Sequence, residues 1–308
     1  MVDGRPRRHE RLNFRRALRW TAWLCLRLAL VLIVLTLGAA IWLVFDARRT
    51  PTGNPEYVAL GSSYAAGAGL GPRQSGSPIL CSRSINGYPP RLARRLRVSL
   101  VDRTCSGSVT RHVLDGGQFF QEAQIRVLGP QTRLVTITAG GNDVGFVRDL
   151  YLLALRNSDS ALGRSVRRIW NGPPALVERD FAQLHDRLSR LIREVRRRSP
   201  AALVVIATYP PVLPASGTCR VLHMTASEAK VMREVQDRLT VVTRQAATSE
   251  GAAVVDMSEI GADHSACSAV PWTKGWGDIR QSPFHPNLNG AQATADAIAV
   301  VFSSVPQH

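Results

Sequence analysis

The chain has 308 residues, enough for one buried domain of ordinary size together with appended segments. Apolar residues make up 45% of it, a fraction that excludes a largely disordered chain. The formal charge of +16 suggests nucleic acid or an anionic membrane as a partner. Ten arginines and three acidic residues place +7 of that charge in residues 1–49. The remaining +9 is scattered, without the basic and aromatic stripe of a nucleic-acid-binding surface, so no nucleic-acid partner is expected.

The first predicted element is a transmembrane helix over residues 20–45. From Leu28 to Phe45 the chain has eighteen residues without a charge, which as a helix span ~27 Å, close to the ~30 Å hydrocarbon core of a bilayer. Extending the helix back to Trp20 includes Arg27, whose long side chain can reach the headgroups.

A cleaved signal peptide is the alternative to this anchor. The apolar part of a signal peptide runs for ~7–15 residues and ends at small residues, whereas here the apolar run continues past Ala39 and Ala40. Seven arginines precede the span and two follow it closely, so the basic tail, residues 1–19, is expected in the cytoplasm. The sequence therefore predicts a single-pass cell-membrane protein whose larger part is extracytoplasmic.

Residues 46–55 contain Pro, Gly and Asn breakers and are predicted to form a linker. Five short apolar, β-rich runs follow, at Tyr57–Leu60, Val98–Val101, Leu134–Thr138, Leu203–Thr208 and Ala252–Val255. Helical patterns lie at Ala175–Arg198, Thr225–Ser249 and Asn289–Phe302. This alternation predicts a doubly wound (flavodoxin-like) α/β domain over residues 56–304, a parallel sheet of about five strands with helices on both faces. Ligands of such folds bind at the carboxyl ends of the strands.

Three segments at these ends carry candidate chemistry. Gly61–Gly67 follows the first strand and presents Ser63 on a glycine-flanked turn, a setting that suits a nucleophile but is also a common structural turn. The third strand runs into Gly140-Gly141-Asn142-Asp143, where Asn142 is either an amide donor for an oxyanion or part of an Asx turn. Before the last helix, Ser282–Asn287 contains His285, a candidate base, although a lone histidine is more often a packed residue.

In this order, the three segments resemble the SGNH (GDSL-like) hydrolase superfamily over about residues 56–304. The blocks of that superfamily are Gly-Asp-Ser, a lone glycine after the second strand, Gly-x-Asn-Asp and Asp-x-x-His. Gly107 stands at the position of the lone glycine. The resemblance implies an esterase or lipase that cleaves carboxylic esters of small molecules or lipids and needs no metal or cofactor.

Carried over position by position, the resemblance assigns four roles. Ser63 attacks the ester carbonyl, and its own backbone N–H contributes to the oxyanion hole. Gly107 supplies a second backbone donor to that hole and Asn142 a side-chain donor. His285 takes the serine proton and returns it to the leaving alcohol.

Two positions depart from the superfamily pattern. Ser62 replaces the aspartate of the first block, and Ser282 replaces the aspartate that orients the histidine. Some secreted esterases of the superfamily work with a Ser–His dyad in which a backbone carbonyl replaces this carboxylate. We therefore expect the carbonyl of Ser282 to accept a hydrogen bond from the ring of His285, with Asp278 as the alternative acid.

These departures keep two further functions open. One is a deacetylase of envelope polysaccharide, and the other is a non-catalytic, degenerate SGNH domain that binds an envelope ligand. The four retained site residues favour an enzyme. The apolar segment after Asp143 contributes either an acyl pocket or packing against the sheet; its members are Val144, Phe146, Val147, Leu150 and Tyr151.

Cys25 lies inside the predicted span, which leaves four cysteines, and hence three possible pairings, in the exported part. We favour Cys81–Cys105 and Cys219–Cys267, because both close local loops at the edge of the expected site. Zinc binding is the alternative, but the cysteines lack a CxxC-like spacing.

Overall fold

The computed structural model describes residues 8–49 and 55–305, and the side chains from residue 19 onward. It divides into two units, residues 1–47 and residues 48–308, which we describe separately. The outer part of the predicted basic tail (1–7) and half of the predicted linker (50–54) lie outside the described residues.

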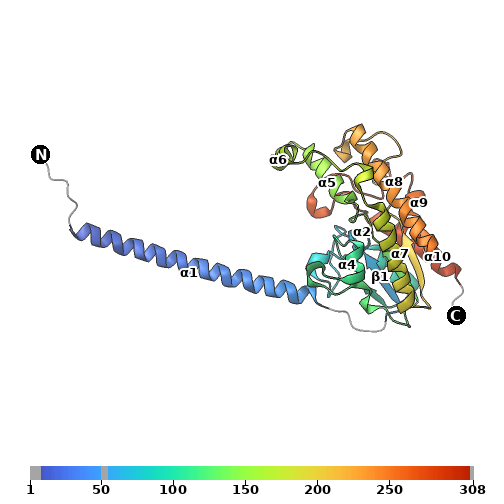
Figure 1. The fold of residues 1–308 in the computed structure, drawn as a ribbon, viewed down its shortest axis with the longest axis horizontal. Coiled ribbons are helices and arrows are strands. Elements are labelled where there is room, and N and C mark those ends of the chain that lie inside the picture. The colour runs from blue at the N-terminus through green and yellow to red at the C-terminus, as the bar shows by residue number, and fades with distance from the viewer. Residues whose placement is uncertain (1–7, 50–54, 306–308) are drawn as a thin grey trace. The chain divides into compact units, whose positions relative to one another are not determined.

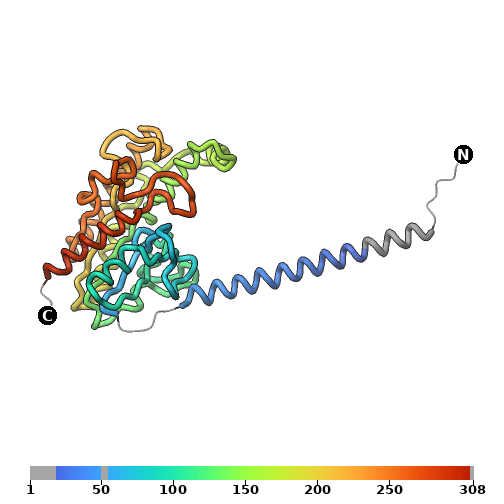
Figure 2. Tube along the Cα trace, turned by 180° about the vertical axis from the view of Figure 1, so that it is seen from behind, coloured from blue at the N-terminus to red at the C-terminus, as the bar shows by residue number. Residues whose placement is uncertain are grey.

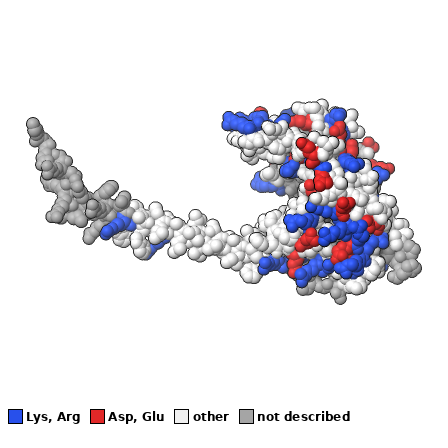
Figure 3. Space-filling view, in the orientation of Figure 1, with Lys and Arg blue, Asp and Glu red and all other residues white. Residues whose placement is uncertain are grey.

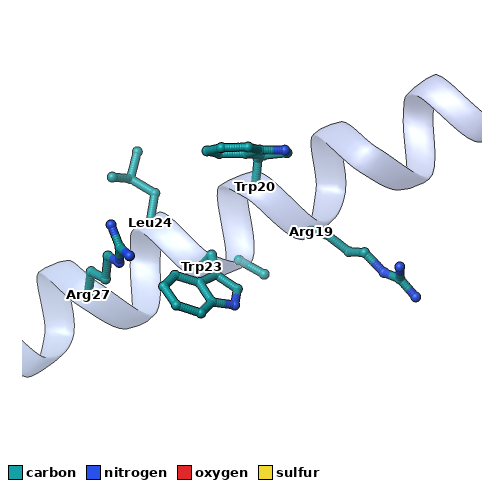
Figure 4. Close-up of a pocket in the computed structure, with 6 residues that line it drawn as sticks. Arg19, Trp20, Trp23, Leu24 and Arg27 are labelled. Atoms are coloured by element: carbon teal, nitrogen blue, oxygen red, sulfur yellow. The ribbon is translucent and has the colours of Figure 1, made fainter.

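The described part of the first unit is one helix, α1 (Arg8–Ala47), which continues two residues into the predicted linker. From Arg19 to Ala47 it is long and apolar enough to cross a membrane. Figure 3 shows this part as an almost uncharged rod, with its basic side chains near one end. There Trp20 and Leu24 lie on one side of the helix, and the guanidinium of Arg27 lies 4.4 Å from the centre of the Trp23 ring (Figure 4). Tryptophan and arginine at one end of an apolar helix are typical of a membrane–water interface.

The second unit is built on a five-stranded parallel sheet of order β2-β1-β3-β4-β5 (Figure 1), which confirms the predicted doubly wound fold. The strands are β1 (Tyr57–Gly61), β2 (Leu100–Asp102), β3 (Leu134–Thr138), β4 (Leu203–Ala207) and β5 (Ala253–Val255). In the register of the two central strands, Gly61 lies beside Thr138.

Both faces of the sheet are covered, and successive residues of each strand enter different cores. In β1, Val58 and Leu60 join the core under α4, α7 and α8, whereas Tyr57 and Ala59 join the core under α3 and α10. This two-sided burial explains why the strands are mostly apolar rather than alternating. Figure 2 shows α10 running along its side of the domain from the opposite view. The bounds of these helices are α3 Tyr88–Leu96, α4 Thr110–Asp115, α7 Phe181–Arg198, α8 Ala226–Ser249 and α10 Leu288–Ser304.

The remaining helices are short and lie mainly in the connections. The α-helices among them are α2 (Ser63–Ala66), α5 (Phe146–Arg156), α6 (Ala161–Ile169) and α9 (Met257–Ile260). The 3₁₀ turns are η1 (Ile79–Cys81), η2 (Gln118–Phe120), η3 (Gln124–Val127), η4 (Leu176–Glu178), η5 (Arg220–Leu222) and η6 (Ile279–Gln281). A third apolar cluster joins α5 to α7, α8 and the loop before α10.

Both favoured disulfides are present, Cys81–Cys105 and Cys219–Cys267. The first joins η1 to the loop after β2, and the second joins the segment before η5 to the loop after α9. The predicted pairing is therefore confirmed.

The topological switch point of the sheet lies between β1 and β3. The chain after β1 crosses to the face covered by α3, and the chain after β3 crosses to the face covered by α7. Two neighbouring strands whose connections leave in opposite directions create the switch point at which doubly wound proteins bind ligands.

Candidate active site

Ser63 lies two residues after the end of β1, as the first residue of α2, and is buried. Gly61, the last residue of β1, has a φ of +136°, and a Cβ there would lie 2.2 Å from the carbonyl oxygen of Thr138. Only glycine fits this approach to β3. The backbone N–H of Ser62 donates to the same carbonyl at 3.0 Å. This turn holds Ser63 at the carboxyl edge of the sheet.

The ring of His285 lies against Ser63, although 222 residues separate the two in sequence. Its Nε2 is 2.7 Å from the Ser63 Oγ, and its Nδ1 is 2.8 Å from the carbonyl oxygen of Pro283. A carbonyl only accepts, so Nδ1 carries the proton and donates it to Pro283. The unprotonated Nε2 of the neutral ring then accepts from the Ser63 hydroxyl, which is the arrangement of a base facing its nucleophile.

Burial lowers the pKa of His285 to about 4. The backbone hydrogen bond to Pro283 opposes this shift, the charge of Lys274 adds to it, and the carbonyl of Ser282 opposes it more weakly. His285 is therefore neutral, and able to take up a proton, throughout the neutral range.

The sequence placed the orienting carbonyl at Ser282, one residue too early. Both Ser282 (φ +51°) and Phe284 (φ +61°) have left-handed backbones, and the carbonyl that bonds to Nδ1 belongs to Pro283 between them. The Tyr64 hydroxyl donates to the carbonyl of Phe284. The N–H of Phe284 in turn donates to the carbonyl of Lys274 at 3.1 Å, so tertiary contacts stabilise this unusual backbone.

Asp278, the alternative acid, does not contact the histidine. Its carboxylate caps η6 and accepts hydrogen bonds from the N–H and the guanidinium of Arg280, which hold its pKa below the usual range. Within the described part of the chain, no carboxylate is hydrogen-bonded to His285, so its orienting partner is the backbone.

The two further oxyanion candidates lie on either side of the β1 turn. Gly107 is exposed, with a φ of +80°, in the loop after β2, and Asn142 follows β3. One N–H of the Asn142 amide donates to the carbonyl of Ser108 at 2.9 Å, which fixes the amide and leaves its second N–H for another acceptor. Among the described residues, the backbone N–H groups of Ser63 and Gly107 donate to no protein acceptor.

Several residues that support this site carry no sequence signal that we recognised. Tyr209, two residues after the end of β4, accepts from the N–H of Gly141 at 3.1 Å, and its hydroxyl lies 3.3 Å from the Ser62 Oγ. Burial raises the pKa of Tyr209 to about 12, so it stays neutral. Tyr209 and Ser62 thus connect the β1 and β3 loops at the position where the superfamily has an aspartate. The position of Tyr209 just after a strand was the available clue in the sequence.

The apolar segment after Asp143 packs in the core. Val144, Phe146, Val147 and Leu150 are all buried, and Phe146 and Leu150 are completely inaccessible. Tyr151 alone is partly exposed; its ring centre lies 6.4 Å from that of His285. Packing, rather than an acyl pocket, therefore explains most of this segment.

Comparison with known proteins agrees with this geometry. The sequence matches the GDSL-like lipase/acylhydrolase family over residues 59–293. It is similar to a lipase of Streptomyces rimosus (31% identity, 76% of this chain and 82% of the relative). It is also similar to lipase 2 of Streptomyces coelicolor (32% identity, 81% and 86%).

Solved structures give the same result. The crystal structure of an extracellular lipase from S. rimosus and that of phospholipase A1 from Streptomyces albidoflavus each superpose with a TM-score of 0.64 at 29% identity. Both cover 81% of this chain and 99% of their own length. The similarity therefore extends over almost the whole length of these two structures.

Proposed function

Because this chain belongs to the GDSL-like lipase/acylhydrolase (SGNH) family and is a carboxylic ester hydrolase, we propose that it cleaves acyl esters of lipids through a Ser63–His285 dyad. We further propose that α1 anchors it in the cytoplasmic membrane. The observation that carries the dyad is the hydrogen-bonded pair formed by Ser63 and His285, with a backbone carbonyl on the far nitrogen of the ring.

The proposed reaction proceeds in two steps. Ser63 Oγ attacks the ester carbonyl while its proton moves to Nε2 of His285, and the alcohol leaves with that proton. Water then attacks the acyl-serine, with His285 again acting as the base. The backbone carbonyl stabilises the imidazolium less than a carboxylate would, so orientation of the ring is its main contribution.

The oxyanion that forms in each step is proposed to bind three N–H groups. These are the free backbone N–H groups of Ser63 and Gly107 and the second N–H of the Asn142 amide. Because Ser108 already holds that amide, little reorganisation is needed when charge develops. Loss of one such donor typically costs ~2.7–4 kcal/mol of transition-state stabilisation.

The substrate class is inferred from relatives and from the anchor. Similar proteins are named lipases, and one similar structure is a phospholipase A1. A helix long enough to span a bilayer would hold the enzyme beside such lipids. Neither finding fixes the chain length of the acyl group, so the test spans short and long esters.

The function is tested on the full-length protein in detergent. The substrates are p-nitrophenyl esters from acetyl to palmitoyl, together with a phosphatidylcholine. We expect turnover by the parent, none by Ser63→Ala, and parental turnover by Ser189→Ala, which removes a buried hydroxyl elsewhere, on α7. A fluorophosphonate should label the parent but not Ser63→Ala. A parent protein that is folded, with its disulfides formed, but neither labelled nor active would refute the proposed enzymatic function.

The anchor has its own test in cells. We propose that residues 1–19 are cytoplasmic, 20–45 span the membrane, 46–55 form a linker and 56–304 are extracytoplasmic. The protein should then stay in the membrane pellet after alkaline carbonate washing, and protease added to spheroplasts should digest the domain. A mature N-terminus after residue 40 would instead identify a cleaved signal peptide.

A further inference from the structure

We propose that Gln124 is a positioning residue that sets the oxyanion donors relative to the nucleophile. It does so through a buried chain of hydrogen bonds from Gly61 through Gln124 and Ser108 to Asn142. This inference rests on the proposed function, because it assumes that Ser63 and Asn142 act together on one ester.

One end of the chain is the strand that carries the nucleophile. Gln124 lies in η3 with only 3% of its surface exposed. Its Oε1 accepts from the N–H of Gly61 at 2.8 Å, and its Nε2 donates to the carbonyl of Gly61 at 3.0 Å. The side-chain amide thus pairs with Gly61 as a neighbouring strand would, two residues before Ser63.

The other end is the loop that carries the oxyanion candidates. The same Nε2 donates its second hydrogen to the Oγ of Ser108 at 3.0 Å, and Ser108 is completely buried. Ser108 follows Gly107 directly, and its carbonyl accepts from the Asn142 amide at 2.9 Å. One glutamine therefore contacts the nucleophile strand and the residue that fixes Asn142.

A second glutamine holds the same loop from its outer side. The amide of Gln118 donates to the carbonyl of Ser106 at 2.8 Å and accepts from the Oγ of Ser108. These two partners lie on either side of Gly107, so Gln118 spans the glycine. Ser108 then has its hydroxyl fixed between Gln118 and Gln124, which makes it the junction of the network.

The chemistry of Gln124 is specific to an amide. Its single oxygen and both of its hydrogens are used, which accounts for the full hydrogen-bonding capacity of the Nε2 group. Methionine matches its size but supplies neither the acceptor nor the donors. Ser108→Ala is a milder substitution, because it removes only the hydroxyl that bonds to Gln118 and Gln124. It leaves the backbone carbonyl that accepts from Asn142.

The experiment compares Gln124→Met with Gln236→Met in the full-length protein in detergent, on a short, soluble p-nitrophenyl ester. Gln236 is an equally buried glutamine on α8 whose Oε1 accepts from the N–H of Val212 at 3.0 Å, away from the network. We expect Gln124→Met to lower kcat by about 10- to 100-fold with KM within about twofold, because the oxyanion develops only after binding. Gln236→Met should stay within about twofold of the parent in both constants.

A double-mutant cycle separates positioning from general destabilisation. If Gln124 acts through the oxyanion donors, Gln124→Met should cost less than about threefold when Asn142→Ala is already present. The affinity for a trifluoromethyl ketone, which forms an oxyanion on Ser63, should fall in parallel with kcat/KM across the series.

Additive losses in that cycle, or a loss in Gln124→Met no greater than in Gln236→Met, would overturn the proposal. If Gln124→Met does not fold, Ser108→Ala carries the test, with an expected fall in kcat of about 3- to 10-fold at unchanged KM. An unchanged kcat in Ser108→Ala overturns the proposal as well. An inactive, unlabelled parent is a distinguishable result: it refutes the proposed function, and the role of Gln124, which rests on that function, is refuted with it.

Discussion

The histidine of the proposed dyad is oriented by a backbone carbonyl, and this sets how it titrates. A buried carboxylate beside the ring would raise the pKa of the imidazole, whereas here burial dominates and lowers it. The base is then neutral over a wide range of pH, and its affinity for a proton is modest. Without an acid partner, His285 is thus a weaker base, but it stays unprotonated over a wider range of pH.

The pH profile of kcat/KM should show this directly. Because the pKa of His285 is lowered to about 4, activity should be flat at neutral pH and fall only as the pH drops through that value, where the ring becomes protonated and cannot accept from Ser63. Initial rates on a short p-nitrophenyl ester between pH 3.5 and 8 check it. An acid limb near the ordinary histidine value of about 6.5 would contradict the buried, carbonyl-bonded ring.

Asp278 should be dispensable. Its carboxylate is occupied by Arg280 and does not contact the histidine, so Asp278→Asn is expected to keep kcat/KM within about twofold of the parent. His285→Ala, measured alongside, should lose at least about a thousandfold. A loss in Asp278→Asn comparable to that of His285→Ala would show that the loop rearranges to bring the carboxylate to the ring during turnover.

At the scale of elements, the five strands could be predicted to within two residues at each end, because a sheet buried on both faces leaves continuous apolar runs. Helices α7, α8 and α10 were predictable from their apolar patterns, although α7 begins at Phe181 and not at Ala175 as predicted. By contrast, α5 was not recognised as a helix, because its buried residues suggested a ligand pocket as readily as a core.

The site was predictable to the extent that it follows strand ends. Ser63, Gly107 and Asn142 follow strands whose carboxyl ends meet at one edge, whereas His285 precedes the last helix and was identified by the resemblance to the superfamily. Gln124 could not be found in this way, because it lies in a short 3₁₀ turn and bonds to the backbone of Gly61 and the hydroxyl of Ser108, which the sequence pattern does not bring together. The orienting carbonyl was predicted one residue too early, at Ser282, for a similar reason. The left-handed backbones of Ser282 and Phe284 decide which carbonyl faces the ring.

The segment after β3 depends on a buried ion pair, and breaking it should be costly. The Arg179 guanidinium lies 2.7 Å from Asp149, with 2% and 0% of the two side chains exposed. Arg179→Met leaves the carboxylate buried, and we expect the free energy of unfolding to fall by about 3–5 kcal/mol. Chemical denaturation of the full-length protein in detergent measures this loss.

The same carboxylate offers a matched control. Arg148 also pairs with Asp149, at 2.9 Å, but 61% of its side chain is exposed. Arg148→Met should therefore cost at most about 1 kcal/mol. Equal effects of the two substitutions would mean that burial of the pair is not what makes it matter.

At the scale of the whole molecule, two disulfides close loops of 24 and 48 residues in a domain that we place outside the cytoplasm. The loop-entropy relation gives each about 3.5–4 kcal/mol of stabilisation. We expect paired Cys→Ser variants of either bridge to lose about that much stability in urea denaturation. The Cys81–Cys105 variant should also lose activity, because the carbonyl of Cys81 accepts from the N–H of Ser106, next to Gly107. Parental stability after reduction would show that the bridges do not stabilise the fold.

The carbonyl of Pro283 has a consequence for how this enzyme can change over generations. A carboxylate partner can be lost through one altered codon, but every amino acid carries a carbonyl oxygen, so no point mutation can delete the group that holds His285. What can fail is the path of the chain: one inserted or deleted residue between Asp278 and His285 would turn a different oxygen toward the ring. The identities of the residues between Asp278 and His285 are thus freer to vary than the number of residues in this segment.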